Sequence, residues 1–461
     1  MDIIIIGCGK VGTTLAEQLV REDHNVVMID TSAERMQRVS DDIDAIKLVG
    51  NGASISMQIE AGVQTADMEA GIETADILIA VTASDEMNLL CCLIARKVGH
   101  CHTIARVRNP IYSNELTFIK QQLGISMIIN PEYAAATEIS RILRFPSAIK
   151  IDPFAKGKVE LLKFKVKPEF KLDGLSVMDI DSQFRCDVLI GGVERGDEVA
   201  IPDGKFVIKN GDMVSIIASP ANSAEFFRKI GIQTNQVRNT LIVGGGTIAY
   251  YLAKLLAAMK IRVKIVEKDK ARCEVLTELL DDALILNGDG TDRQLLLEEG
   301  LMTAEAFVTL TNMDEENVFL ALYAKENSSA KLVTKVNRIA FDELISKLDL
   351  GSLIYPKYIT ADYILQYVRA MQNTIGSNVE TLYHILDGRA EALEFVIREE
   401  SEVTGIPLMN LNLKNNLLIG CINRGGNIKI ARGQDCIQQG DTVIVLTSQK
   451  GLRDIRDILR K

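Results

Sequence analysis

Two glycine-rich segments contain the residue types from which a phosphate-binding loop can be built. The first, Gly7-Cys8-Gly9-Lys10-Val11-Gly12, follows four isoleucines, Ile3 to Ile6, and precedes an apolar stripe at helical spacing. In such a loop the first glycine makes a tight turn, the second lets the backbone approach a pyrophosphate, and the third lets helix and strand pack closely. Free N–H groups and the positive end of the helix dipole favour an anion there. The segment therefore predicts a dinucleotide-binding loop.

An acidic residue stands where such a loop needs one. Asp30 ends the next apolar segment, Asn25 to Ile29. A carboxylate at this place accepts hydrogen bonds from ribose hydroxyls and repels a 2′-phosphate. NAD is therefore favoured over NADP. ATP and ADP remain open alternatives, because the same loop and acid serve any adenosine pyrophosphate.

The same arrangement occurs a second time. Thr240 to Val243 precede Gly244-Gly245-Gly246-Thr247-Ile248-Ala249, and Glu267 ends the apolar segment that follows the next helix. The spacing from Gly9 to Asp30 equals that from Gly246 to Glu267. Alanine at the third glycine position is compatible with the fingerprint. A second dinucleotide site is therefore predicted, with a doubly wound sheet whose loop binds nothing as the alternative for either copy.

The elements that must position the first loop alternate strictly between strand and helix. Strands are expected at residues 3–6, 25–29, 45–49, 76–82, 103–107 and 126–129. This pattern predicts an α/β fold with a Rossmann-like, doubly wound parallel sheet of strand order 3-2-1-4-5-6. Residues 131–145, with Pro131 in the first turn, predict a helix that covers its own sheet edge or crosses to another subunit.

The pattern changes after this helix and then repeats. Short strands are expected at residues 160–166, 187–193, 199–201 and 213–218, followed by a helix at 220–230, which predicts a small α+β module. Thr82 to Asn88 returns as Thr311 to Asn317. The predicted domains are Rossmann-like units at 1–130 and 240–356, a crossover helix at 131–146, a connecting helix at 357–374, a linker at 231–239, and small modules at 147–230 and 375–461.

One insertion distinguishes the two halves. Ala61 to Asp67 is echoed by Ala70 to Asp76, nine residues later. This is a tandem duplication in a surface connection, where added length costs little. No function is assigned to it.

Composition and charge exclude several classes of protein. A chain of 461 residues is too long for one core and predicts several domains. A hydrophobic content of 47% with 25% charged residues is typical of a globular protein. The net charge of −10 argues against a nucleic-acid surface. No run of about 18 apolar residues and no signal peptide are seen, so we expect a soluble protein that meets a membrane only through a partner.

The cysteines and histidines give no metal site or catalytic centre. Eight cysteines fit a reducing cytosol. His100-Cys101-His102 has metal-binding residue types, but adjacent residues cannot all face one ion and no second ligand cluster lies near in sequence. It is interpreted as a surface turn. We expect no metal and no catalytic residue.

At this point the whole chain resembles a known family. Two Rossmann-like units, each followed by a small module, are similar to tandem RCK (regulator of potassium conductance, or KTN) domains, and end to end to the cytosolic regulatory subunits of Trk-type potassium uptake systems. The segments that carry the resemblance are IIIIGCGKVGTTLAEQL, AVTASDEMN with its echo LTNMDEEN, IARVR, and LIGGVERG with its echo LIGCINRG. Two departures are the duplication and Lys335, which stands where the first copy has Arg106.

The resemblance implies a regulatory dinucleotide, NAD or NADH. The implied cofactor-binding residues of the first copy are Gly7, Cys8, Gly9, Lys10, Val11, Gly12, Asp30, Asn51, Thr82, Ala83 and Arg106. Those of the second copy are Gly244, Gly245, Gly246, Thr247, Ile248, Glu267, Gly288, Asp289, Thr311 and Asn312. The positions of three of these residues agree with this role. Thr82 and Thr311 each end the strand next to the first strand of their sheet, and Arg106 could reach a phosphate bidentately. Thr82 with Asp85, and Thr311 with Asp314, also fit a helix capping box.

Two function classes remain. The resemblance implies a peripheral regulatory subunit at the inner face of the membrane, which self-associates as a dimer or tetramer and gates an integral membrane potassium transporter. The small modules are expected to mediate assembly or to bind an unrecognised effector, since they carry no dense cluster of titratable residues. The alternative is an NAD-dependent oxidoreductase, which needs an acid or base near the nicotinamide. The four histidines are not placed near either glycine loop, so an enzyme is not expected.

Overall fold

The computed structural model describes most of the chain. The described residues are 1–63, 75–99, 101–112, 115–145, 150–154, 158–196, 198–231, 237–337, 348, 350–374, 379–386, 389–449, 451–452 and 454–460. Most of the duplicated segment at 61–76, His100, and the centre of the linker at 231–239 lie outside the described residues.

The chain folds into two compact units, and each unit is drawn from both halves of the sequence. The first contains Met1–Ile139 and Asn239–Val368, and the second contains Ser140–Arg238 and Arg369–Lys461. Two of the three boundaries fall inside long helices, α6 (Pro131–Arg144) and α14 (Pro356–Thr374), and the third lies at the start of the strand that begins at Asn239. The two Rossmann-like lobes therefore share the first unit, and the two small modules share the second.

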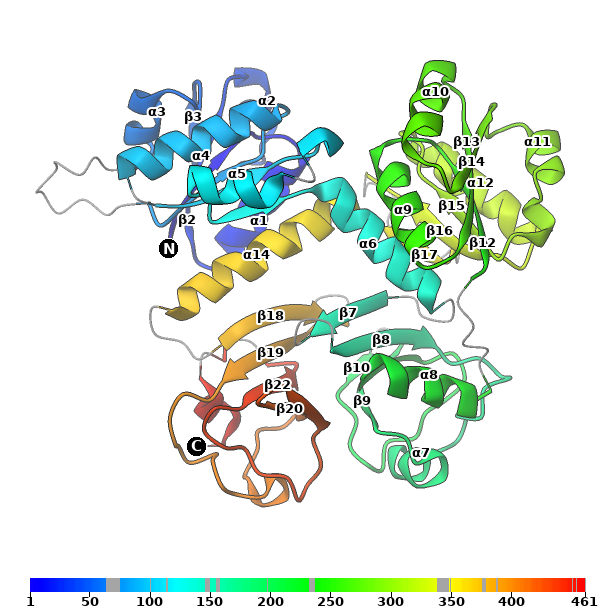
Figure 1. Cartoon of the computed structure of the whole chain (residues 1–461). Coiled ribbons are helices and arrows are strands. Elements are labelled where there is room, and N and C mark those ends of the chain that lie inside the picture. Colours follow the sequence, from blue (N-terminus) through cyan, green and yellow to red (C-terminus); the bar gives the residue numbers. More distant parts are fainter. Residues whose placement is uncertain are drawn as a thin grey trace, which may run out of the picture. The chain divides into compact units, whose positions relative to one another are not determined.

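The first lobe, drawn in blue to cyan in Figure 1, contains a six-stranded parallel sheet with the predicted order, β3-β2-β1-β4-β5-β6, which confirms the doubly wound fold. Its strands are β1 (Asp2–Ile6), β2 (Asn25–Asp30), β3 (Ala45–Val49), β4 (Ile77–Ala80), β5 (His102–Arg106) and β6 (Met127–Ile129). β1 pairs with β2 on one side and β4 on the other. Its four isoleucines are at most 2% exposed, as expected for a central strand without a solvent-facing side.

Helices connect these strands. They are α1 (Lys10–Arg21), α2 (Ala33–Arg38), α3 (Ile55–Glu60), α4 (Asp85–Gly99), the 3-10 turn η1 (Pro110–Tyr112) and α5 (Leu116–Leu123). Cys91 and Cys92 on α4 lie in the core with Cys101. Burial raises the pKa of Cys91 to about 12, so its thiol stays protonated and acts as an apolar core group.

The second lobe repeats this architecture with the order β14-β13-β12-β15-β16-β17. Its strands are β12 (Asn239–Val243), β13 (Arg262–Glu267), β14 (Ala283–Asn287), β15 (Ala306–Thr309), β16 (Lys331–Lys335) and β17 (Ser352–Ile354). Its helices are α9 (Thr247–Ala258), α10 (Lys270–Leu279), α11 (Arg293–Glu298), η3 (Leu301–Thr303) and α12 (Asp314–Asn327). In both lobes the glycine loop connects the central strand to a helix of 12 residues.

The second unit holds two five-stranded sheets, ordered β10-β9-β11-β8-β7 and β18-β19-β22-β20-β21. The first module contains β7 (Lys150–Phe154), β8 (Val159–Lys165), α7 (Val177–Phe184), β9 (Val188–Arg195), β10 (Glu198–Ala200), β11 (Met213–Ala218) and α8 (Pro220–Lys229). The second contains β18 (Val379–Ile385), β19 (Ala390–Val396), η4 (Leu408–Asn410), β20 (Leu417–Arg424), β21 (Asn427–Ile430), β22 (Thr442–Thr447) and η5 (Ile455–Ile458). The sequence pattern missed β7, an edge strand interrupted by Pro153, and α7.

The same ion pair occurs in each small module. Arg195 donates from Nε and Nη2 to the two carboxylate oxygens of Asp212, at 2.8 and 2.7 Å. Arg424 and Asp441 repeat this bidentate contact at 2.8 Å for both bonds. Asp212 and Asp441 are buried, and each also accepts a backbone N–H. One apolar cluster, which includes Ile217 and Leu446, spans both modules, so each completes the core of the other.

Two further findings concern helices. Among the described residues, no helix combines the length and apolar character that a membrane crossing requires. Helix α6 contacts the second lobe of the same chain, where Tyr133 packs edge-on against Tyr251 of α9 with ring centroids 5.5 Å apart. The sequence alternatives for this helix, its own sheet edge or another subunit, did not include this contact.

Candidate functional site

The first glycine loop has the backbone that its sequence predicts. Gly7 adopts φ of +104°, and a Cβ there would lie 2.9 Å from the Thr82 nitrogen. A Cβ on Gly12 would lie 1.9 Å from the Gly7 oxygen, so helix α1 can approach β1 only with glycine at this position. Gly9 differs, because a Cβ there would meet nothing within 4 Å. The loop is therefore tight on its protein side and open at Gly9, where a pyrophosphate is predicted.

The start of α1 is suited to an anion. Gly9 is the N-cap residue, no side chain caps the helix, and the first turn carries no acidic residue. Lys10 is exposed beside it, and Val11 is partly buried. Unbonded N–H groups at the start of a 12-residue helix and a neighbouring cation both stabilise phosphate.

Asp30 braces the loop in addition to its predicted contact with ribose. It ends β2 and is buried. Its Oδ2 accepts the Cys8 N–H at 2.8 Å, and its Oδ1 accepts the Ser32 N–H at 2.8 Å. Arg35 lies 3.6 Å from Oδ2. Because each carboxylate oxygen can accept more than one hydrogen bond, these contacts leave acceptor capacity for a ribose.

Asn51 lies at the same edge of the sheet, just after β3. Its Oδ1 accepts the Ala53 N–H at 3.0 Å, which fixes the turn, and its side chain is exposed. The neighbouring Gly50 N–H donates to the Asp30 carbonyl at 3.0 Å. The structure thus brings Asn51 near Asp30 through the paired ends of β2 and β3.

The end of β4 is held by Asn88, a residue that the sequence analysis did not assign to the site. The Thr82 N–H and Oγ1 both donate to Asn88 Oδ1, at 2.8 and 2.7 Å, and Asn88 Nδ2 donates to the Arg106 carbonyl at 2.8 Å. The predicted capping box of Thr82 is therefore wrong. Ser84 caps α4 instead, because its Oγ accepts the Met87 N–H at 3.2 Å.

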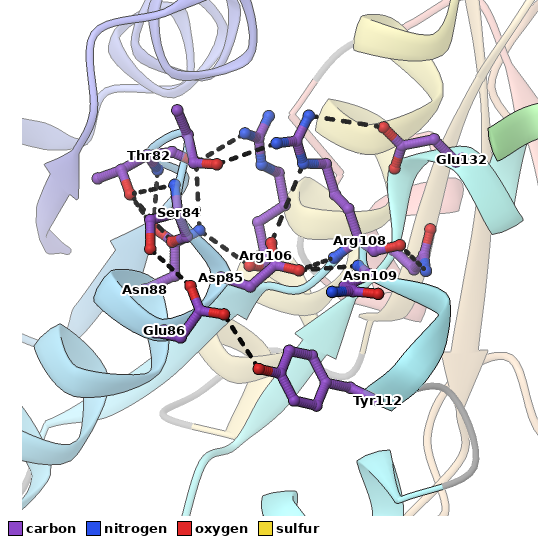
Figure 2. A network of polar contacts seen from close by, with 12 residues as sticks. Thr82, Ser84, Asp85, Glu86, Asn88, Arg106, Arg108, Asn109, Tyr112 and Glu132 are labelled. Atoms are coloured by element: carbon purple, nitrogen blue, oxygen red, sulfur yellow. Dashed lines mark hydrogen bonds and ion pairs between the residues drawn. The ribbon is translucent and has the colours of Figure 1, made fainter. Parts of the chain in front are cut away.

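Arg106 reaches the same place from β5. Its Nη2 donates to the Thr82 carbonyl at 2.6 Å (Figure 2). Its buried Nε has no hydrogen-bond partner in the described part of the chain. Burial lowers the pKa of Arg106, and the neighbouring charge of Arg108 lowers it further. A phosphate would supply the missing acceptor and add negative charge to that of Glu132 and Asp85.

A charged cluster lies beside Arg106. Figure 2 shows the guanidinium groups of Arg106 and Arg108 side by side, with Glu132 facing Arg108. Arg108 Nη1 lies 3.8 Å from Glu132, and Arg108 Nη2 donates to the Ala83 carbonyl at 2.9 Å. Asp85 accepts the N–H groups of Arg108 and Asn109 at 2.9 and 2.8 Å, which explains why it takes no part in the predicted cap. Burial raises the pKa of Glu132.

The second loop repeats the backbone of the first. Gly244 adopts φ of +99°, and a Cβ on Gly246 would meet nothing within 4 Å. Gly246 is the N-cap residue of α9, without a side-chain cap and without an acid in the first turn, and Thr247 and Ile248 open the helix. Glu267 braces this loop as Asp30 braces the first. Its Oε2 accepts the Gly245 N–H at 2.6 Å, and its Oε1 accepts the Asp269 N–H at 2.8 Å.

The end of β15 also repeats, with a different cation. Asn317 Oδ1 accepts the Thr311 N–H at 2.9 Å, and Asn317 Nδ2 donates to the Lys335 carbonyl at 3.0 Å. No side chain caps α12, so the capping box predicted for Thr311 and Asp314 is also wrong. Lys335 is buried and donates from Nζ to the Leu310 carbonyl at 3.2 Å. Burial lowers the pKa of Lys335. Asn312 is exposed.

The ribose edge of the second site is more charged than that of the first. Asp289, which follows β14 and Gly288, pairs with Lys268 at 2.8 Å. Its Oδ1 also accepts the Thr291 N–H at 2.9 Å. The Lys268 ammonium holds the pKa of Asp289 well below its usual range. The first copy has the neutral Asn51 at this turn.

The structure thus gathers the predicted residues of each copy at the carboxyl edge of its own sheet. Asn88, Asn317, Asp85, Arg108 and Glu132 belong to these neighbourhoods and were missed. The signal for Asn88 and Asn317 was present, since each is the last residue of the echoed segment. The two histidines whose side chains are described, His24 and His102, stand at the amino ends of β2 and β5, at the opposite edge. Among the described residues, no group of three metal-ligating side chains occurs.

Each lobe therefore fits the binding of an adenosine pyrophosphate. The open glycine, the unbonded helix start and the acid at the predicted ribose position would bind and orient such a ligand. Within the described residues, neither loop is accompanied by a histidine that could transfer a proton to or from a substrate.

Sequence models of two domain families match the chain, each twice. The TrkA-N domain matches residues 3–131 and 240–356, and the TrkA-C domain matches residues 161–231 and 392–460.

Full-length relatives and solved structures are also similar. The Trk system potassium uptake protein TrkA homolog 1 of Methanosarcina mazei is 31% identical over 99% of both chains. Trk system potassium uptake protein TrkA of Haemophilus influenzae is 32% identical over 98% of this chain and 96% of its own. A solved structure titled "GsuK channel bound to NAD" has a TM-score of 0.63 at 16% identity, covering 96% of this chain and 76% of its own. Another, "Crystal structure of the GsuK bound to ADP", has a TM-score of 0.50 at 14% identity, over 80% and 69%.

Proposed function

The chain belongs to the TrkA family of Trk system potassium uptake proteins, and from this premise we propose that it is a regulatory subunit that gates a membrane potassium transporter in response to a nucleotide. The partner is an integral membrane subunit of the Trk type, and the chain docks on its cytoplasmic face. The proposed roles are nucleotide binding for residues 1–130 and 240–356 and assembly into a dimer or tetramer for residues 147–230 and 375–461.

The observation that carries the proposal is the duplication of one binding arrangement, with no histidine beside either loop in the described part of the chain. Asp30 and Glu267 brace their loops through the same two backbone positions, and Asn88 and Asn317 fix the neighbouring strand ends in the same way. An enzyme needs one such site joined to a proton donor or acceptor near the nicotinamide. Two similar lobes in one compact unit suit sensing better.

The proposed ligand is NAD or NADH, with ATP and ADP as the nearest competitors. The acid at the ribose position favours a ligand without a 2′-phosphate. The open glycine and the unpartnered Nε of Arg106 favour a pyrophosphate. NAD and ADP are also the ligands in the titles of the GsuK structures, whose similarity concerns the fold.

A bound nucleotide would act only through its different affinity for two arrangements of the assembly. A tenfold preference, about 1.4 kcal/mol, moves a balanced equilibrium to about ten to one. A ligand that bound both arrangements equally would leave transport unchanged, however tightly it bound.

The test is calorimetric titration of the purified full chain with NADH, NAD, ATP and ADP, beside a turnover assay in which NADH oxidation is followed with a panel of carbonyl substrates. We expect binding at up to two sites per chain and no turnover. Absence of binding by all four nucleotides would contradict the proposal. Binding with steady turnover would favour the oxidoreductase alternative.

A further inference from the structure

One hydrogen-bonded contact joins the two candidate sites inside the first unit. Tyr251 lies on α9, about one turn beyond Gly246 of the second loop. Its hydroxyl accepts a hydrogen bond from Asn130 Nδ2 at 3.0 Å. Asn130 also caps α6, because its Oδ1 accepts the Tyr133 N–H at 2.9 Å. The helix that starts at the second glycine loop is therefore tied to the start of the helix that leaves the first lobe.

The contact continues into the first site through Arg108. The Tyr251 hydroxyl and Asn130 Nδ2 both face the Arg108 carbonyl oxygen, at 3.5 and 3.4 Å. The guanidinium of the same arginine donates to the carbonyl of Ala83, one of the predicted ligand residues. Figure 2 shows this guanidinium beside that of Arg106. Two contacts therefore lead from α9 to the edge of the first site.

The two copies of the repeat have different residues at the positions of Tyr251 and Arg108. Counted from Gly9 and Gly246, the counterpart of Tyr251 in the first copy is Thr14. Counted from Arg106 and Lys335, the counterpart of Arg108 in the second copy is Asn337. Threonine lacks the length of a phenol side chain, and asparagine lacks a guanidinium. Elsewhere the two sites keep the acid, the strand-end asparagine and the open glycine. The tyrosine is therefore not required by the fold that both copies share.

The contact links the position of α9 to that of the start of α6. Tyr251 is 5% exposed, and the centroid of its ring lies 5.5 Å from that of Tyr133 and 5.1 Å from that of Tyr250. Burial raises the pKa of Tyr251, so the phenol keeps its proton. A packed ring whose hydroxyl has fixed partners cannot shift without moving either α9 or the start of α6.

We propose that nucleotide binding at the two lobes is energetically coupled, and that the Tyr251–Asn130–Arg108 contact carries this coupling. The inference rests on the proposed nucleotide-binding function. A nucleotide on the second loop fixes the start of α9 and so the placement of Tyr251, which sets the position of Arg108 beside Ala83. By thermodynamic linkage, a nucleotide at the first site changes affinity at the second by the same factor.

The test needs variants in which one site is blocked while the fold is kept. Gly9 and Gly246 suit this purpose, because each is an N-cap residue with open space where a Cβ would lie. Aspartate is a favoured N-cap residue, and its carboxylate would occupy and repel the place of a pyrophosphate. Gly246→Asp therefore reports the first site alone, and Gly9→Asp reports the second alone. NADH fluorescence is the readout, and the chain contains no tryptophan to interfere. ADP and ATP are titrated in parallel by calorimetry.

The expected result is that the wild-type isotherm departs from the sum of the two blocked variants, with one binding constant changed roughly fivefold. In the Tyr251→Phe background, the isotherm should equal the sum of its own blocked variants. Asn130→Ser is a second variant, which keeps a capping oxygen and removes the amide donor, and it should also lose the coupling. Tyr250→Phe removes the neighbouring hydroxyl as a matched control and should keep it.

The outcomes separate the two proposals. A wild-type isotherm equal to the sum of the blocked variants overturns the coupling and leaves nucleotide binding intact. Coupling that survives in both Tyr251→Phe and Asn130→Ser overturns the assigned contact. Failure of NADH, ADP and ATP to bind the wild-type chain overturns the proposed function, and this inference with it.

Discussion

The two Rossmann-like lobes agree in their backbone contacts and differ in the side chains that face a ligand. In both, the acid at the end of the second strand accepts two N–H groups, from the glycine loop and from the turn that follows the acid. In both, a buried asparagine joins the fourth strand to the fifth. The side chains at the two positions expected to face phosphate differ: the first lobe has the cations Lys10 and Arg106, and the second has the neutral Thr247 and the cation Lys335.

This difference separates what the fold requires from what the ligand requires. The repeated contacts are made to backbone groups, which any lobe of this shape must satisfy. The divergent residues stand where phosphate charge is expected, so they can change without loss of the fold. Each cation donates to a carbonyl of its own lobe, Arg106 to Thr82 and Lys335 to Leu310, but among the described residues the Nε of Arg106 has no partner. We therefore expect the two sites to bind a nucleotide with unequal affinities, although the backbone contacts that frame them are the same.

The largest expected effect tests the shared framework. Asn88→Ala and Asn317→Ala should each lower the free energy of unfolding by about 3 kcal/mol, because the backbone groups at two strand ends lose a buried partner. Urea denaturation of the full chain, followed by circular dichroism, measures this loss. A large loss in one variant and none in the other would break the comparison, since the two asparagines would then have different roles.

The next effect tests whether the pyrophosphate of the nucleotide lies at each glycine loop. Gly9→Asp and Gly246→Asp should each weaken nucleotide binding at their own site roughly 100-fold, about 2.7 kcal/mol, while stability stays within about 0.5 kcal/mol. Calorimetry with NADH and ADP gives the affinities, and thermal melts without nucleotide give the control. Full occupancy of both sites in Gly9→Asp would show that the pyrophosphate does not lie at this loop.

A smaller effect concerns the acids. Asp30→Ala and Glu267→Ala should weaken binding at their own sites roughly 30-fold, about 2 kcal/mol, through loss of a charge-assisted bond to ribose and of the loop brace. Asp30→Asn separates the two causes, because its amide keeps one acceptor oxygen but has no charge. Affinity at the first site that is unchanged in Asp30→Ala would count against the ribose assignment.

The smallest expected effect sharpens the contrast between the cations. Arg106→Lys should weaken the first site roughly fivefold, about 1 kcal/mol, because a lysine cannot make the bidentate contact of a guanidinium. This substitution makes the affinity of the first site more similar to that of the second. The difference in affinity between the two unmodified sites is measured by comparing Gly246→Asp, which binds only at the first site, with Gly9→Asp, which binds only at the second. Equal affinities in those two variants would remove the idea of unequal sites.

The framework of each site could be predicted because it depends on local sequence. Glycines at fixed spacing and an acid at the end of the next strand determine loop, helix and ribose contact together. The order of the parallel strands follows from the same pattern, and both sheets confirm it.

The contacts that were missed depend on tertiary packing. Thr82 and Asp85 have the spacing of a capping box, but Asn88 takes the Thr82 N–H and the loop after β5 takes the Asp85 carboxylate. These partners come from other elements, so local spacing gave the wrong result. The contact of Tyr251 with Asn130 joins residues from different lobes and has no signal within either segment. Strand β7 was missed because an edge strand interrupted by proline lacks the alternating pattern.

The central claim is that a nucleotide bound in these lobes sets the rate of potassium transport by a membrane partner. The most direct measurement is potassium flux into vesicles that contain the Trk-type membrane subunit, with wild-type chain or Gly9→Asp, in the presence of NADH, ATP or ADP. Flux should change with the nucleotide when the wild-type chain is present. With Gly9→Asp the response should be reduced or lost, although co-sedimentation still shows the chain on the vesicles. Flux that is the same with every nucleotide, while the wild-type chain is bound to the vesicles and saturated with ligand, would contradict the account.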